Sequence, residues 1–389
     1  MVGFLHASSA TQPGDDEILP LQPALWRIGF NWMANRDRIK SLHIPTILVL
    51  SDSWSGGPTP PDDYSKYDAF VTRFAGWGAG YNFTWDIWNE PDETWAFTGT
   101  RQQFFEAFEH ASKDIHTALG NKTQVSGPSI GIYDHAFMQQ FLDYCLAQHV
   151  QLEVLSWHEL STDNTISVIA EHLKDARTSF LNNPMYRPLG IKKIEINEII
   201  GPSAQYDPSD TLAYFYYLEA GGADGACRAC WDNNCVNNTL DGILTPDTMK
   251  PRAAWWAYLA YAETVKSRVA SISGNPNLAV FAGVHPDTVN DASVLISCFA
   301  DQHSSSEIAY HTAGPVTVKL LNLQKLTALR AAKQVTVVVG KIPNSGAEPL
   351  EKPELVRTEI VPITHGTAEI SLPAVALHDV YLLLISKPH

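Results

Sequence analysis

The sequence predicts an α/β protein, a (β/α)8 TIM barrel followed by a C-terminal β-sandwich domain. Eight apolar runs of strand type alternate with helical segments over roughly the first 265 residues, which is the size and rhythm of such a barrel. After Ser267 the pattern changes to short strands separated by Gly, Pro, Asn and Asp. A length of 389 residues also exceeds what one compact core usually holds. We therefore expect a catalytic barrel over residues 1–266 and a β-sandwich accessory domain over residues 267–389.

The expected barrel strands are short runs rich in β-branched and aromatic residues. They are Val2–His6, Leu25–Phe30, Pro45–Leu50, Phe83–Trp88, Gln124–Ser129, Leu152–His158, Lys193–Glu198 and Gly225–Trp231. The segments between them show helical spacing of apolar residues. The expected helices are Asn35–Leu42, Tyr64–Trp77, Arg101–Leu119, His135–His149, Thr165–Leu181, Asp210–Ala220 and Lys250–Val265. A doubly wound open sheet is the alternative, but no glycine-rich phosphate loop follows the first strand.

The C-terminal part needs no helix of any length, which favours a β-sandwich. Its expected strands are Asn277–His285, Ala292–Phe299, Val316–Asn322, Gln334–Gly340, Thr358–Ile363, Thr367–Leu372 and Val380–Ser386. We find no internal repeat and no coiled-coil heptad pattern in this part or in the barrel.

The charge balance is acidic, with 27 Lys and Arg against 42 Asp and Glu, a net charge of −15. This balance argues against nucleic acid or an anionic membrane surface as a partner. No apolar run approaches the roughly 18 residues that a membrane span requires. The 11 Trp and 14 Tyr are plentiful, and indole faces are what sugar-binding clefts use.

Three features bear on the cellular compartment. Residues Met1–His6 do not have the form of a signal peptide. N-glycosylation sequons begin at Asn82, Asn121 and Asn237, close to the number expected by chance. The sequons, together with the local disulfide that we expect among the cysteines, favour a secreted, extracellular glycoprotein.

Three of the five cysteines, Cys227, Cys230 and Cys235, crowd into one short segment. A zinc site would require a fourth soft ligand, and Cys145 and Cys298 lie far away in sequence. We expect a disulfide within the group and one leftover thiol, with the pairing left open, and neither a metal nor another cofactor.

The active site of a barrel lies at the C-terminal ends of its strands, so the polar residues there are candidates for function. They are His6, Arg27, Asn89, Glu90, His158, Asn197, Glu198 and Trp231. Two carboxylates, Glu90 and Glu198, end strands four and seven, and each follows an Asn. Carboxylates that flank a bond in this way are what glycoside hydrolysis requires, because one protonates the leaving oxygen and the other attacks or activates water.

The run Trp88-Asn89-Glu90-Pro91-Asp92, with Glu198 ending strand seven and a trailing β-sandwich, resembles glycoside hydrolase family 39 within clan A of the retaining glycosidases. That family contains β-xylosidases and α-L-iduronidases. The resemblance implies that Glu90 is the general acid/base, that Glu198 is the nucleophile, and that Asn89 binds the sugar 2-hydroxyl. The chain departs from the family at Arg27-Ile28-Gly29, where the xylosidases often carry Arg-Phe-His.

Physical chemistry supports the same roles. Aromatic surroundings such as Trp88 and Trp95 are expected to raise the pKa of Glu90 by desolvation, as a proton donor requires. Arg27 is expected to hold the pKa of Glu198 down. Glu195 is a rival nucleophile, and strand parity alone does not decide between it and Glu198.

The remaining candidates contact substrate in our interpretation, although each also has a structural explanation. Trp231 suits a sugar platform or plain core, and His158 suits a sugar contact or a structural histidine. Loop tryptophans such as Trp54 and Trp95 are as often packing as recognition. Further candidates are Asn197, Arg27, His6, and the loop residues Asp52 and Asp232, although a loop Asp is commonly a turn or cap residue.

The sequence thus predicts a retaining glycoside hydrolase acting on an oligo- or polysaccharide with neutral xylose-, arabinose-, glucose- or galactose-type linkages. Few basic residues lie near the strand ends, so an iduronidase-like enzyme on acidic sugars is the less favoured alternative. A catalytically inactive carbohydrate-binding protein on the same fold, and a zinc hydrolase using the cysteines, are the alternatives from other classes.

Overall fold

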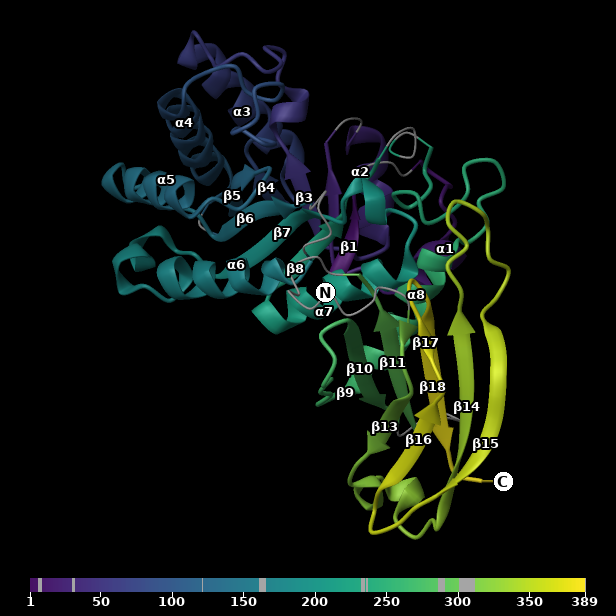
Figure 1. The fold of residues 1–389 in the computed structure, drawn as a ribbon. Helices are drawn as coiled ribbons and strands as arrows, with labels where there is room; N and C mark the ends of the chain where they lie inside the picture. The colour runs from purple at the N-terminus through teal and green to yellow at the C-terminus, as the bar shows by residue number, and fades with distance from the viewer. Residues whose placement is uncertain are drawn as a thin grey trace.

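The N-terminal part of the chain is a closed barrel of eight parallel strands, and it confirms the predicted fold class (Figure 1). The strands are β1 (Val2–Leu5), β2 (Trp26–Ile28), β3 (Thr46–Val49), β4 (Thr84–Asp86), β5 (Gln124–Ile130), β6 (Val154–Glu159), β7 (Lys193–Ile199) and β8 (Gly225–Arg228). Each pairs in parallel with the next, and β1 pairs with β8 to close the barrel. The computed structural model describes residues 1–5, 9–29, 32–120, 122–160, 166–231, 235, 237–285, 291–300 and 312–388.

Helices surround the barrel because each buries one apolar face against the strands. They are α1 (Asp15–Ile18), α2 (Trp32–Ser41), α3 (Tyr64–Gly78), α4 (Arg101–Leu119), α5 (His135–Ala147), α6 (Val168–Ala176), α7 (Pro208–Gly221) and α8 (Ala253–Thr264). The bounds of α4 are as predicted, since Thr100 and Gln103 form a capping box at its start. Helix α1 was not predicted because four residues are too few to show a helical period.

The C-terminal part is antiparallel β structure, drawn in green to yellow below the barrel in Figure 1. A six-stranded sheet has the order β15-β14-β18-β11-β10-β9, and β12 with β17 and β13 with β16 form two small sheets. The strands are β9 (Arg268–Val269), β10 (Leu278–Val284), β11 (Ala292–Cys298), β12 (Thr312–Ala313), β13 (Val316–Leu320), β14 (Gln334–Ile342), β15 (Glu354–Pro362), β16 (Ala368–Leu372), β17 (Val375–Ala376) and β18 (Val380–Ser386). The exact division at residue 266 stays a prediction.

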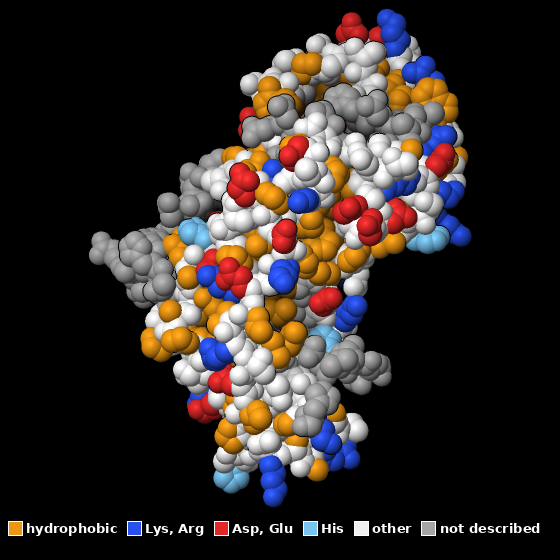
Figure 2. Space-filling model, turned by 90° about the vertical axis from the view of Figure 1, so that its right-hand side faces the viewer, with side chains coloured by type: hydrophobic (Ala, Val, Ile, Leu, Met, Phe, Trp, Pro, Cys, Tyr) orange, Lys and Arg blue, Asp and Glu red, His pale blue; other side chains and the backbone are white. Residues whose placement is uncertain are grey.

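The sheet packs against α7 and α8, and polar contacts tie the two parts together. The Ser297 hydroxyl donates to the carbonyl of Ser209 at 2.8 Å, and the indole of Trp256 donates to the carbonyl of Leu350 at 2.7 Å. Figure 2 shows acidic and basic side chains interspersed on one face of the molecule, with hydrophobic side chains between them. Among the described helices, none has the length and apolarity to cross a membrane.

Candidate active site

A buried arginine organises the mouth of the barrel. Arg27, on β2, is 1% exposed and donates to Asp86 on β4 at 2.8 and 3.0 Å, to Asn89 at 2.8 Å and to Glu198 on β7 at 2.6 Å. Burial lowers the pKa of Arg27, but Asp86 and Glu198 outweigh that effect and leave the pKa raised. One permanent cation therefore holds two carboxylates and an amide in fixed places.

Asp86 is a site residue that the sequence reasoning missed. Its carboxylate is fully buried and also accepts from the Ser129 hydroxyl at 2.6 Å and from the Asn197 amide at 3.0 Å. A charge inside a strand that is otherwise aromatic and β-branched has to be paired to be stable. A charged residue inside an apolar strand, together with Arg27 on strand two, is the sequence signal that would have identified Asp86.

A β-bulge lets two consecutive residues of β7 face the site. Trp157 of β6 pairs with Ile196, but His158 pairs with Glu198, so Asn197 is skipped in the ladder. The Asn197 amide contacts Asp86 inside the barrel while Glu198 reaches Arg27 at the mouth. The bulge explains why strand parity could not decide the question.

Glu195, the rival candidate, lies elsewhere. It is 2% exposed, burial raises its pKa, and its ion-pair partner is Lys193 at 3.5 Å, toward the start of the strand. Of the two carboxylates, Glu198 is the one that contacts the arginine at the barrel mouth.

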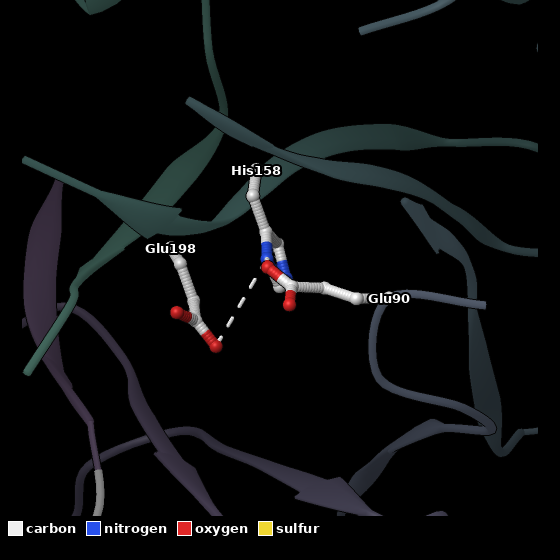
Figure 3. A group of neighbouring side chains, drawn as sticks. All are labelled: Glu90, His158 and Glu198. Atoms are coloured by element: carbon white, nitrogen blue, oxygen red, sulfur yellow. Dashed lines mark hydrogen bonds and ion pairs between the residues drawn. The ribbon is translucent and has the colours of Figure 1, made fainter. Parts of the chain in front are cut away.

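Glu90 lies four residues after the end of β4 and has a left-handed backbone, φ 46°. Its amide donates to the carbonyl of Ser129 at 2.9 Å, which fixes the turn at the mouth of the barrel. Its carboxylate lies 2.7 Å from Nδ1 of His158, which is itself 4.0 Å from Glu198. Figure 3 shows the side chains of Glu90 and Glu198 extending toward the imidazole of His158.

The expected rise in the pKa of Glu90 is wrong for the free protein. Burial raises this pKa, but the hydrogen bond and charge of His158, with the charge of Arg27, outweigh it and leave the pKa below its usual value. Trp88 is buried, whereas Trp95 is 65% exposed and contributes little desolvation. His158, which the sequence analysis suggested as a sugar contact, is thus a direct partner of Glu90.

The other residues predicted to contact substrate differ in how close they lie to the strand ends. The Trp231 indole donates to the carbonyl of Ile200 at 2.9 Å, so its ring is anchored just after β7 and β8. Trp54 packs against Tyr67 and Phe70 of α3, with ring centroids 5.1 Å apart in both pairs. Trp54 is therefore at least partly a packing residue. His6 and Asp232 lie outside the described residues.

Among the described residues, one nitrogen or oxygen of Glu90, His158 and Glu198 each lies within 4.8 Å of the others, a spacing that also suits a metal ion. The imidazole Nδ1 is already hydrogen-bonded to Glu90, however, and a histidine with two nearby carboxylates is equally suited to acid–base catalysis.

The cysteine segment holds a disulfide between Cys230 and Cys235, and Cys227 is free and buried. The predicted local disulfide with one leftover thiol is thereby confirmed.

Comparison with known proteins supports the predicted resemblance. The model of glycosyl hydrolases family 39 matches residues 54–185. A β-xylosidase from Geobacillus stearothermophilus is 29% identical over 128 residues, which are 30% of this chain and 25% of the relative. The chain thus matches only about a quarter of the length of this curated relative.

Solved structures resemble the whole chain in fold. A protein from Neocallimastix frontalis has a TM-score of 0.77 at 19% identity and covers 99% of this chain and 95% of its own. The glycoside hydrolase family 39 enzyme from Xanthomonas axonopodis pv. citri has a TM-score of 0.71 at 13% identity, with 100% and 94% coverage. At these identities the likeness shows the fold alone, and the similarity to glycosyl hydrolases family 39 rests on the matched segment.

Proposed function

Because the chain is a relative of glycoside hydrolase family 39, we propose that it is a retaining glycosidase that cleaves a neutral glycan by double displacement. The observation that carries the proposal is the spacing of the two carboxylates. One oxygen of Glu90 and one of Glu198 lie within 4.8 Å of each other. Retaining enzymes keep their carboxyl groups about 5–5.5 Å apart, whereas inverting enzymes separate them by roughly 6.5–9.5 Å to admit a water.

In the first step the Glu198 carboxylate attacks the anomeric carbon and the bond to the leaving oxygen breaks. Glu90 gives its proton to that oxygen. In the second step Glu90 takes a proton from water, which attacks the same carbon and releases Glu198. Arg27 orients Glu198 through the 2.6 Å ion pair.

In this proposal Asn89 binds the sugar 2-hydroxyl. Its side-chain oxygen accepts from Arg27 at 2.8 Å, which orients the amide and leaves its NH2 group as the donor toward substrate. A hydrogen bond to the 2-hydroxyl strengthens as the oxocarbenium-like transition state forms.

The curated relatives are β-xylosidases, so a nitrophenyl β-xyloside is the first substrate to test, followed by arabinosides, glucosides and galactosides. Secretion and glycosylation at Asn82, Asn121 or Asn237 remain part of the proposal, supported by the Cys230–Cys235 disulfide. A binding-only protein is less favoured because both carboxylates and their arginine are present in one compact site.

The test is Glu198→Gly on the full chain. We expect turnover of an aryl glycoside to fall by about 10⁴-fold or more, the scale of losing a nucleophile. Azide should restore part of the rate and give a glycosyl azide of inverted configuration, because azide attacks from the vacated face. Glu351→Gly, at an exposed position of the C-terminal part, is the matched control. Unchanged activity of the Glu198 variant would refute the mechanism.

A further inference from the structure

Asp52 lies at the barrel mouth over a glycine that leaves room for it. It sits in the single turn Ser51–Ser53 that follows β3. A Cβ placed on Gly29, just after β2, would lie 1.7 Å from Oδ2 of Asp52. Any side chain at position 29 would therefore displace the Asp52 carboxylate. The position of this carboxylate thus depends on a glycine at the end of the neighbouring strand.

The charges around Asp52 are those of the catalytic centre. Burial raises the pKa of Asp52 to about 6, while Arg27 acts to lower it and Asp86 and Glu198 act to raise it further. Asp52 is therefore close enough to the nucleophile for each carboxylate to affect the other.

The Asp52 carboxylate has a nearby cation but no hydrogen-bond donor among the described residues. The Arg27 nitrogens donate to Asp86, Asn89 and Glu198. Within the described part of the chain, no residue donates a hydrogen bond to the Asp52 side chain. A partly buried carboxylate lacking donors is costly in the free protein, and hydroxyl groups of a ligand would satisfy it.

We propose that Asp52 is a specificity-determining residue, whose carboxylate accepts hydrogen bonds from ring hydroxyls of the sugar that Glu198 attacks. This inference rests on the proposed glycosidase function and names the sugar chemistry that the site selects. An ionised carboxylate only accepts hydrogen bonds, so it selects groups that donate.

The same charge pattern disfavours acidic sugars. Arg27, already bonded to three acceptors, faces four carboxylates at the barrel mouth: Asp52, Asp86, Glu90 and Glu198. A uronate would bring a fifth negative charge into this group, whose cation Arg27 already has three partners. A neutral sugar with free hydroxyls fits the site instead.

The test combines protein variants with deoxy substrates. Asp52→Ala and Asp52→Asn are assayed on the best aryl glycoside and on its 2-, 3- and 4-deoxy analogues, with Asp62→Asn, an exposed aspartate of the same loop, as the control. For Asp52→Ala we expect kcat/KM on the parent sugar to fall by about 10- to 100-fold, the scale of a hydrogen bond to a charged group. The loss should nearly vanish on the analogue that lacks the hydroxyl bound by Asp52.

An equal loss on every analogue would overturn the proposal, because it would show a structural role, and so would activity equal to that of the control. Gly29→Ala provides an independent variant that leaves Asp52 in the sequence but moves its carboxylate. Its loss should match that of Asp52→Ala, and the double variant should lose no more than either single one. Additive losses would contradict the pairing of the two residues.

The two proposals fail separately. If azide rescues Glu198→Gly while Asp52→Ala behaves as the control does, only the assignment of Asp52 is wrong. If Glu198→Gly keeps its activity, the glycosidase mechanism itself is wrong, whatever the Asp52 variants show.

Discussion

The barrel mouth and the junction between α7 and the C-terminal sheet both hold buried carboxylates beside a cationic group, but they satisfy them differently. At the mouth, Asp86 and Glu198 share Arg27. At the junction, Asp207 lies 2.5 Å from Nδ1 of His378, which is a cation only when protonated. The mouth depends on a permanent charge, whereas the junction depends on one that titrates.

Neutral donors complete the junction. Asp207 caps α7 by accepting from the amides of Ser209 and Asp210 at 2.8 and 3.1 Å, and it accepts from the Asn344 side chain at 3.0 Å. Its negative charge is therefore stabilised even without the imidazole. The mouth instead leaves carboxylate oxygens for a ligand. This contrast distinguishes the proposed catalytic site from a contact that joins the two parts of the chain.

The largest effect is expected from removing the permanent cation with Arg27→Gln. This change leaves the buried Asp86 and the partly buried Glu198 without a counter-charge, so the free energy of unfolding should fall by about 3–5 kcal/mol. Activity should fall by at least about 10³-fold, because Glu198 loses its orientation. Denaturant unfolding and kcat/KM on an aryl glycoside measure the two losses.

The matched variant at the junction is Lys341→Gln. Lys341 pairs with Asp379 at 2.7 Å, but its side chain is 26% exposed, so the loss of stability should stay below about 1 kcal/mol, with activity unchanged. Equal losses of stability for the two variants would remove the contrast between mouth and junction.

The alkaline limb of the pH profile of kcat/KM tests how His158 affects the pKa of Glu90. His158 lowers the pKa of Glu90, and Glu90 must be protonated to act as the acid. In His158→Gln the pKa of Glu90 should rise, so the fall of kcat/KM on the alkaline side should move upward by about one pH unit. His172→Gln, whose imidazole pairs with Glu159 instead, should leave that limb in place. A downward shift in the His158 variant would contradict our assignment of the hydrogen bond.

Much of the architecture followed from the sequence because it depends on local patterns. Apolar runs with turn residues between them located the eight barrel strands, although the fourth ends at Asp86, before the Asn-Glu-Pro stop. Pattern cannot give register, and a slip of one residue reverses every side chain. The bulge at Asn197 is such a slip, so the common orientation of Asn197 and Glu198 was beyond prediction.

The electrostatics of the site were harder to predict because they depend on contacts between distant strands. The aromatic residues beside Glu90 suggested desolvation, and burial does act in that direction. The imidazole that outweighs it lies 68 residues away in sequence, at the end of β6. Asp86 was missed for the same reason, since its partner Arg27 is 59 residues away. The charge of Asp86 inside an apolar strand indicates that it needs a partner, but the distances between such partners are known only once the barrel closes.

The smallest effect is expected at the junction, from His378→Asn. Asp207 raises the pKa of His378 above its usual 6.5, and Asp210 and Asp379 add to that rise. A raised pKa stabilises the fold fully below the unfolded value and loses that contribution as the pH rises through the folded value. Because the side chain is 42% exposed, the contribution should be below about 1 kcal/mol.

The variant should therefore be less stable than the parent at about pH 5.5 and equal to it at about pH 9. Asn is chosen because residue 378 has φ 68°, a left-handed conformation that Asn tolerates. His365→Asn, exposed and also left-handed at φ 51°, is the control. Thermal unfolding at about pH 5.5 and about pH 9 measures the stability lost in the variant. A loss of stability at the higher pH as large as at the lower one would show that His378 acts through packing. The junction would then not depend on a titrating charge.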